Sequence, residues 1–196
     1  MLTAQQALDR LLEGNQRFAL NLGARAGAFC AARREQLLNE QKPFAIVLGC
    51  SDSRVPAEIV FDQGLGDLFV IRIAGNIVQP SQIGSVEFAA HMFGVRLAVV
   101  LGHTQCGAVQ AALDAAKDNA PALSPNIETI VDRIRPAIRH LADADLDEAV
   151  KANVRHSVDQ LRNGSSILLN LQENDGLLIV GAVYSLETGY VEIIDP

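Results

Sequence analysis

Two patterns of hydrophobic residues alternate along this chain, short continuous runs and longer periodic stretches. The continuous runs cover residues 44–49, 68–73, 97–102 and 177–183. Apolar runs of this length, of which the second contains one charged residue, Arg72, are typical of strands buried on both faces, as in a parallel sheet. The stretches between them are long enough for helical crossovers, and we predict helices over residues 82–93, 106–117, 126–141 and 145–171.

A fifth strand is predicted near the end of the sequence. Residues 190–194 alternate between apolar and polar side chains, which indicates a strand with one exposed face. Residues 184–190 have the composition of a hairpin turn, so this strand is expected to lie antiparallel at an edge. The order of elements predicts an α/β fold, with a mostly parallel central sheet of four strands, one antiparallel edge strand and helices on both faces.

The first forty residues are predicted to form a helical arm. Thr3 and Gln6 have the spacing of a capping box, and apolar residues recur at helical intervals through residues 3–21. A second, short helix is expected at roughly residues 29–40. We therefore expect a single domain, in which residues 1–40 form an N-terminal helical arm and residues 41–196 form the α/β core.

The composition narrows the functional classes. Of the 196 residues, 49% are apolar, which is enough to build a hydrophobic core. Lys and Arg number 16 against 23 Asp and Glu, a net charge of −7, so the basic surface that nucleic-acid binding requires is missing. No run of about 18 apolar residues is present, and we expect no membrane span.

The cysteines indicate a reducing compartment. Cys30, Cys50 and Cys106 are odd in number and far apart, which argues against a disulfide framework. In a reducing environment a cysteine is a metal ligand, a nucleophile or a small buried side chain. The N-terminal segment also lacks the apolar core of a signal peptide, so a cytoplasmic location is expected.

Conspicuous polar segments follow two of the predicted strands. The first strand runs into Cys-Ser-Asp-Ser-Arg at residues 50–54, and the third into Gly-His-Thr-Gln-Cys-Gly at residues 102–107. In open α/β sheets, ligands bind beyond the carboxyl ends of the strands, where the strand order switches. If the first and third strands are neighbours, both segments face the same crevice.

This crevice would hold Cys50, His103 and Cys106, for which three interpretations are open. Two thiolates and an imidazole are a catalytic zinc set that leaves a fourth position for water or substrate, and such soft ligands disfavour magnesium and calcium. Alternatively, one cysteine is a nucleophile activated by His103. The third interpretation is that all three are ordinary buried residues.

Asp52 and Arg54 lie two residues apart in the same turn. They have the residue types of a bidentate ion pair, which is short, strong and orienting. One interpretation is a structural pair that caps the following turn. Beside a metal, the carboxylate could instead ligate the ion or accept a proton from bound water, with Arg54 deciding between these states.

Together these residues resemble the β-class carbonic anhydrases. Residues 50–54 match the first signature of that family and residues 102–107 match its second, with further matching blocks at residues 69–72, 75–76 and 84–88. The resemblance implies reversible hydration of CO2 to bicarbonate and a proton. It also implies one Zn2+ per chain, bound by Cys50, His103 and Cys106.

The resemblance further implies a catalytic dyad of Asp52 and Arg54, which orients the zinc-bound hydroxide that attacks CO2. Asp52 would be a fourth zinc ligand in a closed state. One group within the family, regulated by bicarbonate, carries Trp three residues before the first cysteine. Here that position is Val47 and the chain has no Trp, so the chain resembles the plant-like subgroup.

In that subgroup a substrate channel lies at a subunit interface. Gln41, Phe69 and Phe88 match positions that bind substrate or line the channel, and Gly107 would offer a backbone N–H to the bound anion. The resemblance thus implies CO2 and bicarbonate as ligands and a homodimer or higher even oligomer with the active site at the interface. The N-terminal helix would embrace the partner, although its apolar stripe could also pack within its own chain.

Three other functions remain open from the sequence. A relative with the same zinc site could hydrolyse CS2 or COS, which are linear like CO2. A non-catalytic bicarbonate or zinc sensor would not require Asp52 or Arg54. A cysteine-nucleophile enzyme would be active without metal, and metal analysis distinguishes it from the main interpretation.

Overall fold

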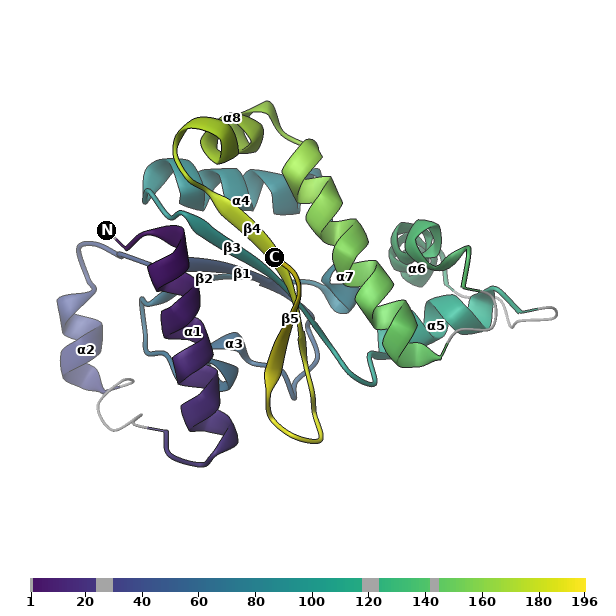
Figure 1. Cartoon of the computed structure of the whole chain (residues 1–196), viewed down its shortest axis with the longest axis horizontal. Coiled ribbons are helices and arrows are strands. Elements are labelled where there is room, and N and C mark those ends of the chain that lie inside the picture. Colours follow the sequence, from purple (N-terminus) through teal and green to yellow (C-terminus); the bar gives the residue numbers. More distant parts are fainter. Residues whose placement is uncertain (1, 24–29, 118–123, 142–144) are drawn as a thin grey trace.

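A five-stranded sheet forms the centre of the molecule. The computed structural model describes residues 2–23, 30–117, 124–141 and 145–196. In them the strand order is β2-β1-β3-β4-β5. The strands are β1 (Ala45–Gly49), β2 (Leu68–Arg72), β3 (Leu97–His103), β4 (Leu178–Tyr184) and β5 (Val191–Asp195). The first four are parallel and β5 pairs antiparallel with β4, which confirms the predicted sheet (Figure 1).

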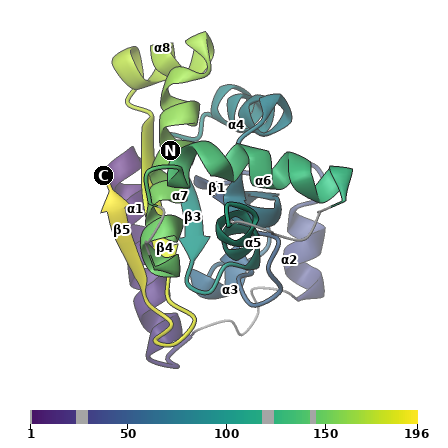
Figure 2. The same cartoon turned by 90° about the vertical axis from the view of Figure 1, so that its right-hand side faces the viewer.

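Helices cover both faces of this sheet, as predicted. They are α1 (Ala4–Ala19), α2 (Ala31–Gln36), α3 (Ala57–Val60), α4 (Pro80–Met92), α5 (Gly107–Ala115), α6 (Pro125–Ile138), α7 (Leu146–Asn163) and α8 (Ser166–Asn174), with a short 3-10 turn, η1 (Ala74–Asn76). Helices α1 and α3 pack on one face, and α4 to α8 pack on the other (Figures 1 and 2).

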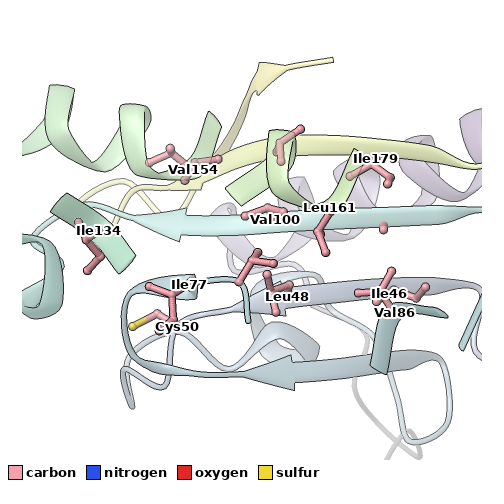
Figure 3. Close-up of a cluster of buried hydrophobic side chains, with 14 of the residues drawn as sticks. Ile46, Leu48, Cys50, Ile77, Val86, Val100, Ile134, Val154, Leu161 and Ile179 are labelled. Carbon is pink, nitrogen blue, oxygen red and sulfur yellow. The ribbon is translucent and has the colours of Figure 1, made fainter. Parts of the chain in front are cut away.

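Alternate residues of each central strand enter different cores. Ile46 and Leu48 face α4 and α7 (Figure 3), whereas Ala45 and Val47 face α1 and α3. This follows from the strand geometry, in which successive side chains point to opposite faces. Burial on both faces explains why the apolar runs in the sequence are continuous.

The two strands that carry the polar segments are neighbours. β1 pairs with β3 in parallel, with Gly49 opposite Leu101, and β2 lies on the other side of β1. After β1 the chain continues to β2 on one side of the sheet, and after β3 it continues to β4 on the opposite side. The carboxyl ends of β1 and β3 form the switch point at which α/β sheets bind ligands.

The N-terminal helix packs on its own chain. Its capping box between Thr3 and Gln6 is present, and its apolar stripe of Ala7, Leu8 and Leu11 is buried in the core on the α1 face of the sheet. The apolar stripe of the helix therefore packs within its own chain.

The helix predicted over residues 145–171 was wrong in its continuity. It is divided into α7 and α8 at Gly164 and Ser165. Gly164 ends α7 because glycine is a poor helix former, and the Ser165 hydroxyl accepts from Leu168 N to cap α8. The helix expected at residues 29–40 is the six-residue α2, and residue 29 itself lies outside the described residues. The short elements α3 and η1 were not predicted.

Helix α1 approaches α3 so closely that Gly14 has no room for a side chain. A Cβ atom on Gly14 would lie 1.9 Å from the Phe61 carbonyl oxygen. We expect Gly14→Ala to lower the free energy of unfolding by about 3 kcal/mol, the size of a severe overpacking, as measured by denaturant titration. Glu13→Ala is the control, since Glu13 is exposed on the same helix. Equal stability of the two variants would contradict this close approach.

Candidate metal centre

Three buried side chains from two neighbouring strand ends converge on one point. Cys50 follows β1 directly, His103 is the last residue of β3, and Cys106 is the residue before α5. One ligand atom of each lies within 4.8 Å of those of the other two. All three residues are at most 5% exposed, and Cys50 lies at the end of the buried cluster in Figure 3.

The turn between His103 and Cys106 directs both side chains to the same point. Gln105 has a left-handed backbone with φ of +57°, which turns the chain sharply before α5. Thr104 anchors the turn, because its N–H donates to the Tyr184 carbonyl oxygen at 3.0 Å and its hydroxyl accepts from Leu186 N at 3.0 Å. Tyr184 and Leu186 belong to the hairpin that joins β4 to β5. Because this hairpin holds the turn in place, the side chains of His103 and Cys106 can bind the same ion.

The donor set fits a zinc ion. His103 Nδ1 lies 2.9 Å from the Thr104 carbonyl oxygen, which can only accept, so Nδ1 carries the proton and Nε2 presents a lone pair. Nε2 is buried and has no hydrogen-bond partner, which is costly unless it binds a ligand. Two thiolates and one imidazole with a carbonyl-bound second nitrogen are typical zinc ligands.

The electrostatics of the two sulfurs favour a cation between them. A hydrogen bond from Cys106 lowers the pKa of Cys50, helped by the Gly75 N–H and opposed by burial. The same sulfur contact, together with burial, raises the pKa of Cys106. One sulfur is thus readily ionised at the expense of the other. A divalent cation would stabilise both as thiolates.

Asp52 and Arg54 form the bidentate pair that their spacing allows. Arg54 Nε donates to Asp52 Oδ1 at 3.0 Å and a terminal guanidinium nitrogen donates to Oδ2 at 2.8 Å. This hydrogen bonding holds the pKa of Asp52 far below its usual range. The carboxylate lies beside the ligand cluster and outside it, with Oδ2 3.9 Å from His103 Nε2. In this structure Asp52 is therefore paired with arginine and lies outside the cluster.

Arg72 is a site residue to which the sequence analysis assigned no role. It is the last residue of β2, and its guanidinium donates to the carbonyl oxygens of Cys50 at 3.0 Å and Asp52 at 2.6 Å. It holds the backbone that carries Cys50 and Asp52. The feature that could have indicated this role is the position of Arg72 at the end of the strand that neighbours β1.

The structure does not bring the predicted channel residues to the ligand cluster within one chain. Phe69 lies opposite Ile46 on β1, four residues before Cys50, or about 13 Å along a strand. Its ring is 6.3 Å from that of Phe88 on α4. Gln41 is an exposed residue before β1. Gly107, by contrast, is exposed and begins α5 directly after Cys106, so it does lie beside the cluster.

The third cysteine lies away from the cluster. Cys30 is an exposed free thiol before α2 and is not one of the three clustered residues. In the described ranges, helices of a length and apolarity suited to crossing a bilayer are absent.

Comparison with known proteins identifies the family. The family model described as carbonic anhydrase matches residues 45–191. Carbonic anhydrase 2 of Mycobacterium tuberculosis is 38% identical over 192 residues, which cover 96% of this chain and 92% of that protein. The crystal structure of the β-carbonic anhydrase CafA of Aspergillus fumigatus superposes with a TM-score of 0.73 at 28% identity, covering 96% and 90% of the two chains. The chain belongs to the β-carbonic anhydrase family.

Other β-carbonic anhydrases agree with this assignment. The carbonic anhydrase of Mycolicibacterium smegmatis is 42% identical over 164 residues, 82% of this chain and 79% of that protein. A tetrameric β-carbonic anhydrase of Sordaria macrospora has the same fold, with a TM-score of 0.76 at 23% identity over 95% and 96% of the chains. The predicted resemblance and the predicted enzyme class, carbonate dehydratase, are confirmed, and hydration of CO2 is the general reaction of the family.

Proposed function

We propose that this β-carbonic anhydrase catalyses the reversible hydration of CO2 to bicarbonate and a proton with one Zn2+ held by Cys50, His103 and Cys106. The observation that carries the proposal is the convergence of these three buried ligand atoms within 4.8 Å, with an unpartnered Nε2 among them. When bound, zinc supplies a hydroxide nucleophile at neutral pH by lowering the pKa of water.

Asp52 and Arg54 orient this chemistry without binding the metal. The Asp52 carboxylate stays ionised because Arg54 lowers its pKa, so it is an acceptor for the proton of the attacking oxygen. A single acceptor at a fixed place aligns the oxygen lone pair with the carbon of CO2. Arg54 in turn prevents the carboxylate from becoming a fourth ligand.

The product side of the reaction needs a weak anion site. Gly107 begins α5, and its side-chain position is open, with no atom within 4 Å of a Cβ built there. The free N–H groups and positive dipole end of a helix favour an anion. We propose that the Gly107 N–H contacts bicarbonate before it leaves.

A second copy of the chain completes the substrate channel in this proposal. Phe88 is 51% exposed and Met92 on the same helix is 62% exposed, so α4 presents apolar surface next to Phe69 and Phe93. Such surface is typical of a subunit contact. We propose an even homo-oligomer in the cytoplasm, with Gln41 and these aromatic residues contributed by the neighbour; the Sordaria relative is described as tetrameric.

The test is metal-dependent CO2 hydration. The purified chain is expected to contain about one zinc per protomer, to lose activity in parallel with zinc during chelation, and to recover both when zinc is returned. Metal analysis and a stopped-flow CO2 assay measure the two quantities. Activity that survives metal removal would refute the proposal and favour a cysteine nucleophile. Turnover of CS2 without turnover of CO2 would favour the hydrolase alternative.

A further inference from the structure

Two buried polar side chains interrupt an otherwise apolar face of α7. Asn153 and Ser157 are each 1% exposed, and they lie one turn apart among Val150, Val154 and Val158, which pack into the core over the sheet. Burial of an amide or a hydroxyl costs free energy unless hydrogen bonds compensate it. An apolar side chain would pack here at lower cost, so both residues require an explanation.

Both side chains donate to the same short turn. Asn153 Nδ2 donates to the Gly75 carbonyl oxygen at 2.8 Å, and Ser157 Oγ donates to the Asn76 carbonyl oxygen at 3.0 Å. This turn is η1, whose backbone is left-handed at Gly75, with φ of +70°, and at Asn76, with φ of +45°. The buried carbonyl groups of this turn lie outside the hydrogen-bond patterns of the helices and strands, so they need side-chain donors such as these two.

The turn also contacts a metal ligand. Gly75 N donates to the Cys50 sulfur at 3.3 Å in a buried hydrogen bond. The backbone comes this close only because residue 75 has no side chain: a Cβ atom would lie 2.8 Å from Ile134 Cδ1 and 3.1 Å from Ala108 Cβ. Asn153 thus holds the carbonyl group of the residue whose N–H meets the sulfur.

The cluster of buried polar side chains around η1 lowers the stability of the fold. Asn76 Nδ2 and Asn153 Oδ1 are buried without hydrogen-bond partners. An unsatisfied buried polar atom typically destabilises a fold by about 1–3 kcal/mol. The amide at residue 153 thus satisfies one buried carbonyl group while leaving its own oxygen unsatisfied, and the peptide that it holds is the one whose N–H meets the Cys50 sulfur.

We propose that Asn153, assisted by Ser157, is a positioning residue of the metal centre, which holds the Gly75 peptide so that its N–H stays on the Cys50 sulfur. The inference rests on the proposed function, in which Cys50 is a zinc ligand. Groups that support a ligand from behind fix its orientation and donor strength, and their loss typically costs about 10- to 100-fold in metal affinity.

The experiment compares four full-length proteins: the wild type, Asn153→Leu, Ser157→Ala and Val158→Ala. Leucine has the same branched arrangement of side-chain heavy atoms as asparagine, although it is somewhat larger, and it cannot donate. Val158 is buried on the same helix and offers the turn no hydrogen bond. In competition with a chelator, we expect Asn153→Leu to bind zinc about 10-fold or more weakly. Ser157→Ala should show a smaller loss, and Val158→Ala should keep the wild-type affinity despite a lower Tm.

Cobalt(II) loading gives an independent readout. Loss of the N–H donor raises the energy of the sulfur lone pairs, so the thiolate-to-cobalt charge-transfer band of Asn153→Leu is expected at longer wavelength than in the wild type. The bands of Val158→Ala and the wild type should coincide. Because this shift reports on the sulfur itself, a general loosening of the core does not produce it.

The outcomes separate this inference from the proposed function. A folded Asn153→Leu protein with wild-type zinc affinity and band position would overturn the inference, as would an equal effect in Val158→Ala. If Asn153→Leu does not fold, Ser157→Ala decides in the same way, since it removes only a hydroxyl from a helix. A wild-type chain that binds no zinc would instead overturn the proposed function.

Discussion

Arg54→Ala is expected to lower kcat/KM for CO2 hydration by about 100-fold or more while zinc is retained, the usual size of effect for a proton-acceptor pair. Arg54 offers no ligand atom to the metal. It holds both oxygens of the Asp52 carboxylate, at 3.0 and 2.8 Å. Asp52 Oδ2 lies only 3.9 Å from His103 Nε2. Without the two hydrogen bonds from Arg54, the carboxylate can therefore turn toward the cluster and close the site as a fourth ligand.

Two further variants separate charge from geometry in this dyad. Asp52→Asn keeps the shape of the side chain but removes the acceptor charge, and we expect a loss of the same order with zinc retained. Arg54→Lys keeps the positive charge but not the bidentate contact, so an intermediate loss is expected. Stopped-flow kinetics and metal analysis on each protein check these results. Full activity of zinc-loaded Arg54→Ala or Asp52→Asn would refute the role of the dyad.

The pH dependence gives a second signature of the same pair. Hydrogen bonding to Arg54 lowers the pKa of Asp52 from its ordinary value of 3.8. The pair therefore stabilises the fold at pH values above 3.8, and this contribution is lost as the pH falls through the lower folded value. In Arg54→Ala the largest cause, the side-chain hydrogen bonding, is gone, so the pKa of Asp52 returns toward its ordinary value. The difference in free energy of unfolding between the wild type and Arg54→Ala should therefore shrink as the pH falls below 3.8, as measured by denaturant titration.

The sheet and the ligand cluster could be predicted because both depend on local patterns. Continuous apolar runs mark the parallel strands, and the polar segments at the ends of β1 and β3 carry the candidate ligands Cys50, His103 and Cys106. Adjacency of these two strands, which brings the ligands together, was only a condition in the sequence analysis and is found in the sheet. The break between α7 and α8 was also indicated by the local sequence, in which the helix breaker Gly164 is followed by the capping residue Ser165.

Long-range support of the site could not be predicted in this way. Arg72 acts on carbonyl groups of residues twenty or more positions away, and Asn153 reaches Gly75 across 78 positions. In the sequence, Asn153 is one polar residue on a helix, with nothing to indicate whether it faces solvent or core. Only the packing of α7 on the turn η1 gives it a partner.

Cys106→Ser is expected to abolish tight zinc binding, and with it CO2 hydration down to the uncatalysed rate. A serine hydroxyl is a poor donor at neutral pH because it stays protonated, whereas zinc prefers thiolate sulfur in such sites. Loss of more than about 100-fold in zinc affinity is expected, at least the size seen for changes behind the ligands. Cys30→Ser is the matched control, since Cys30 is exposed and outside the cluster.

The stability of this variant without metal distinguishes a ligand from a structural cysteine. In the metal-free wild type, the Cys106 thiol donates to the Cys50 sulfur, which lowers the pKa of Cys50 and raises that of Cys106. A serine hydroxyl at residue 106 can make the same donation, so the metal-free Tm should stay close to that of the metal-free wild type. Added zinc should then raise the Tm of the wild type and of Cys30→Ser by mass action, but not that of Cys106→Ser. A zinc-dependent rise in Cys106→Ser equal to that of the wild type would contradict the ligand role, because binding would then not involve this sulfur.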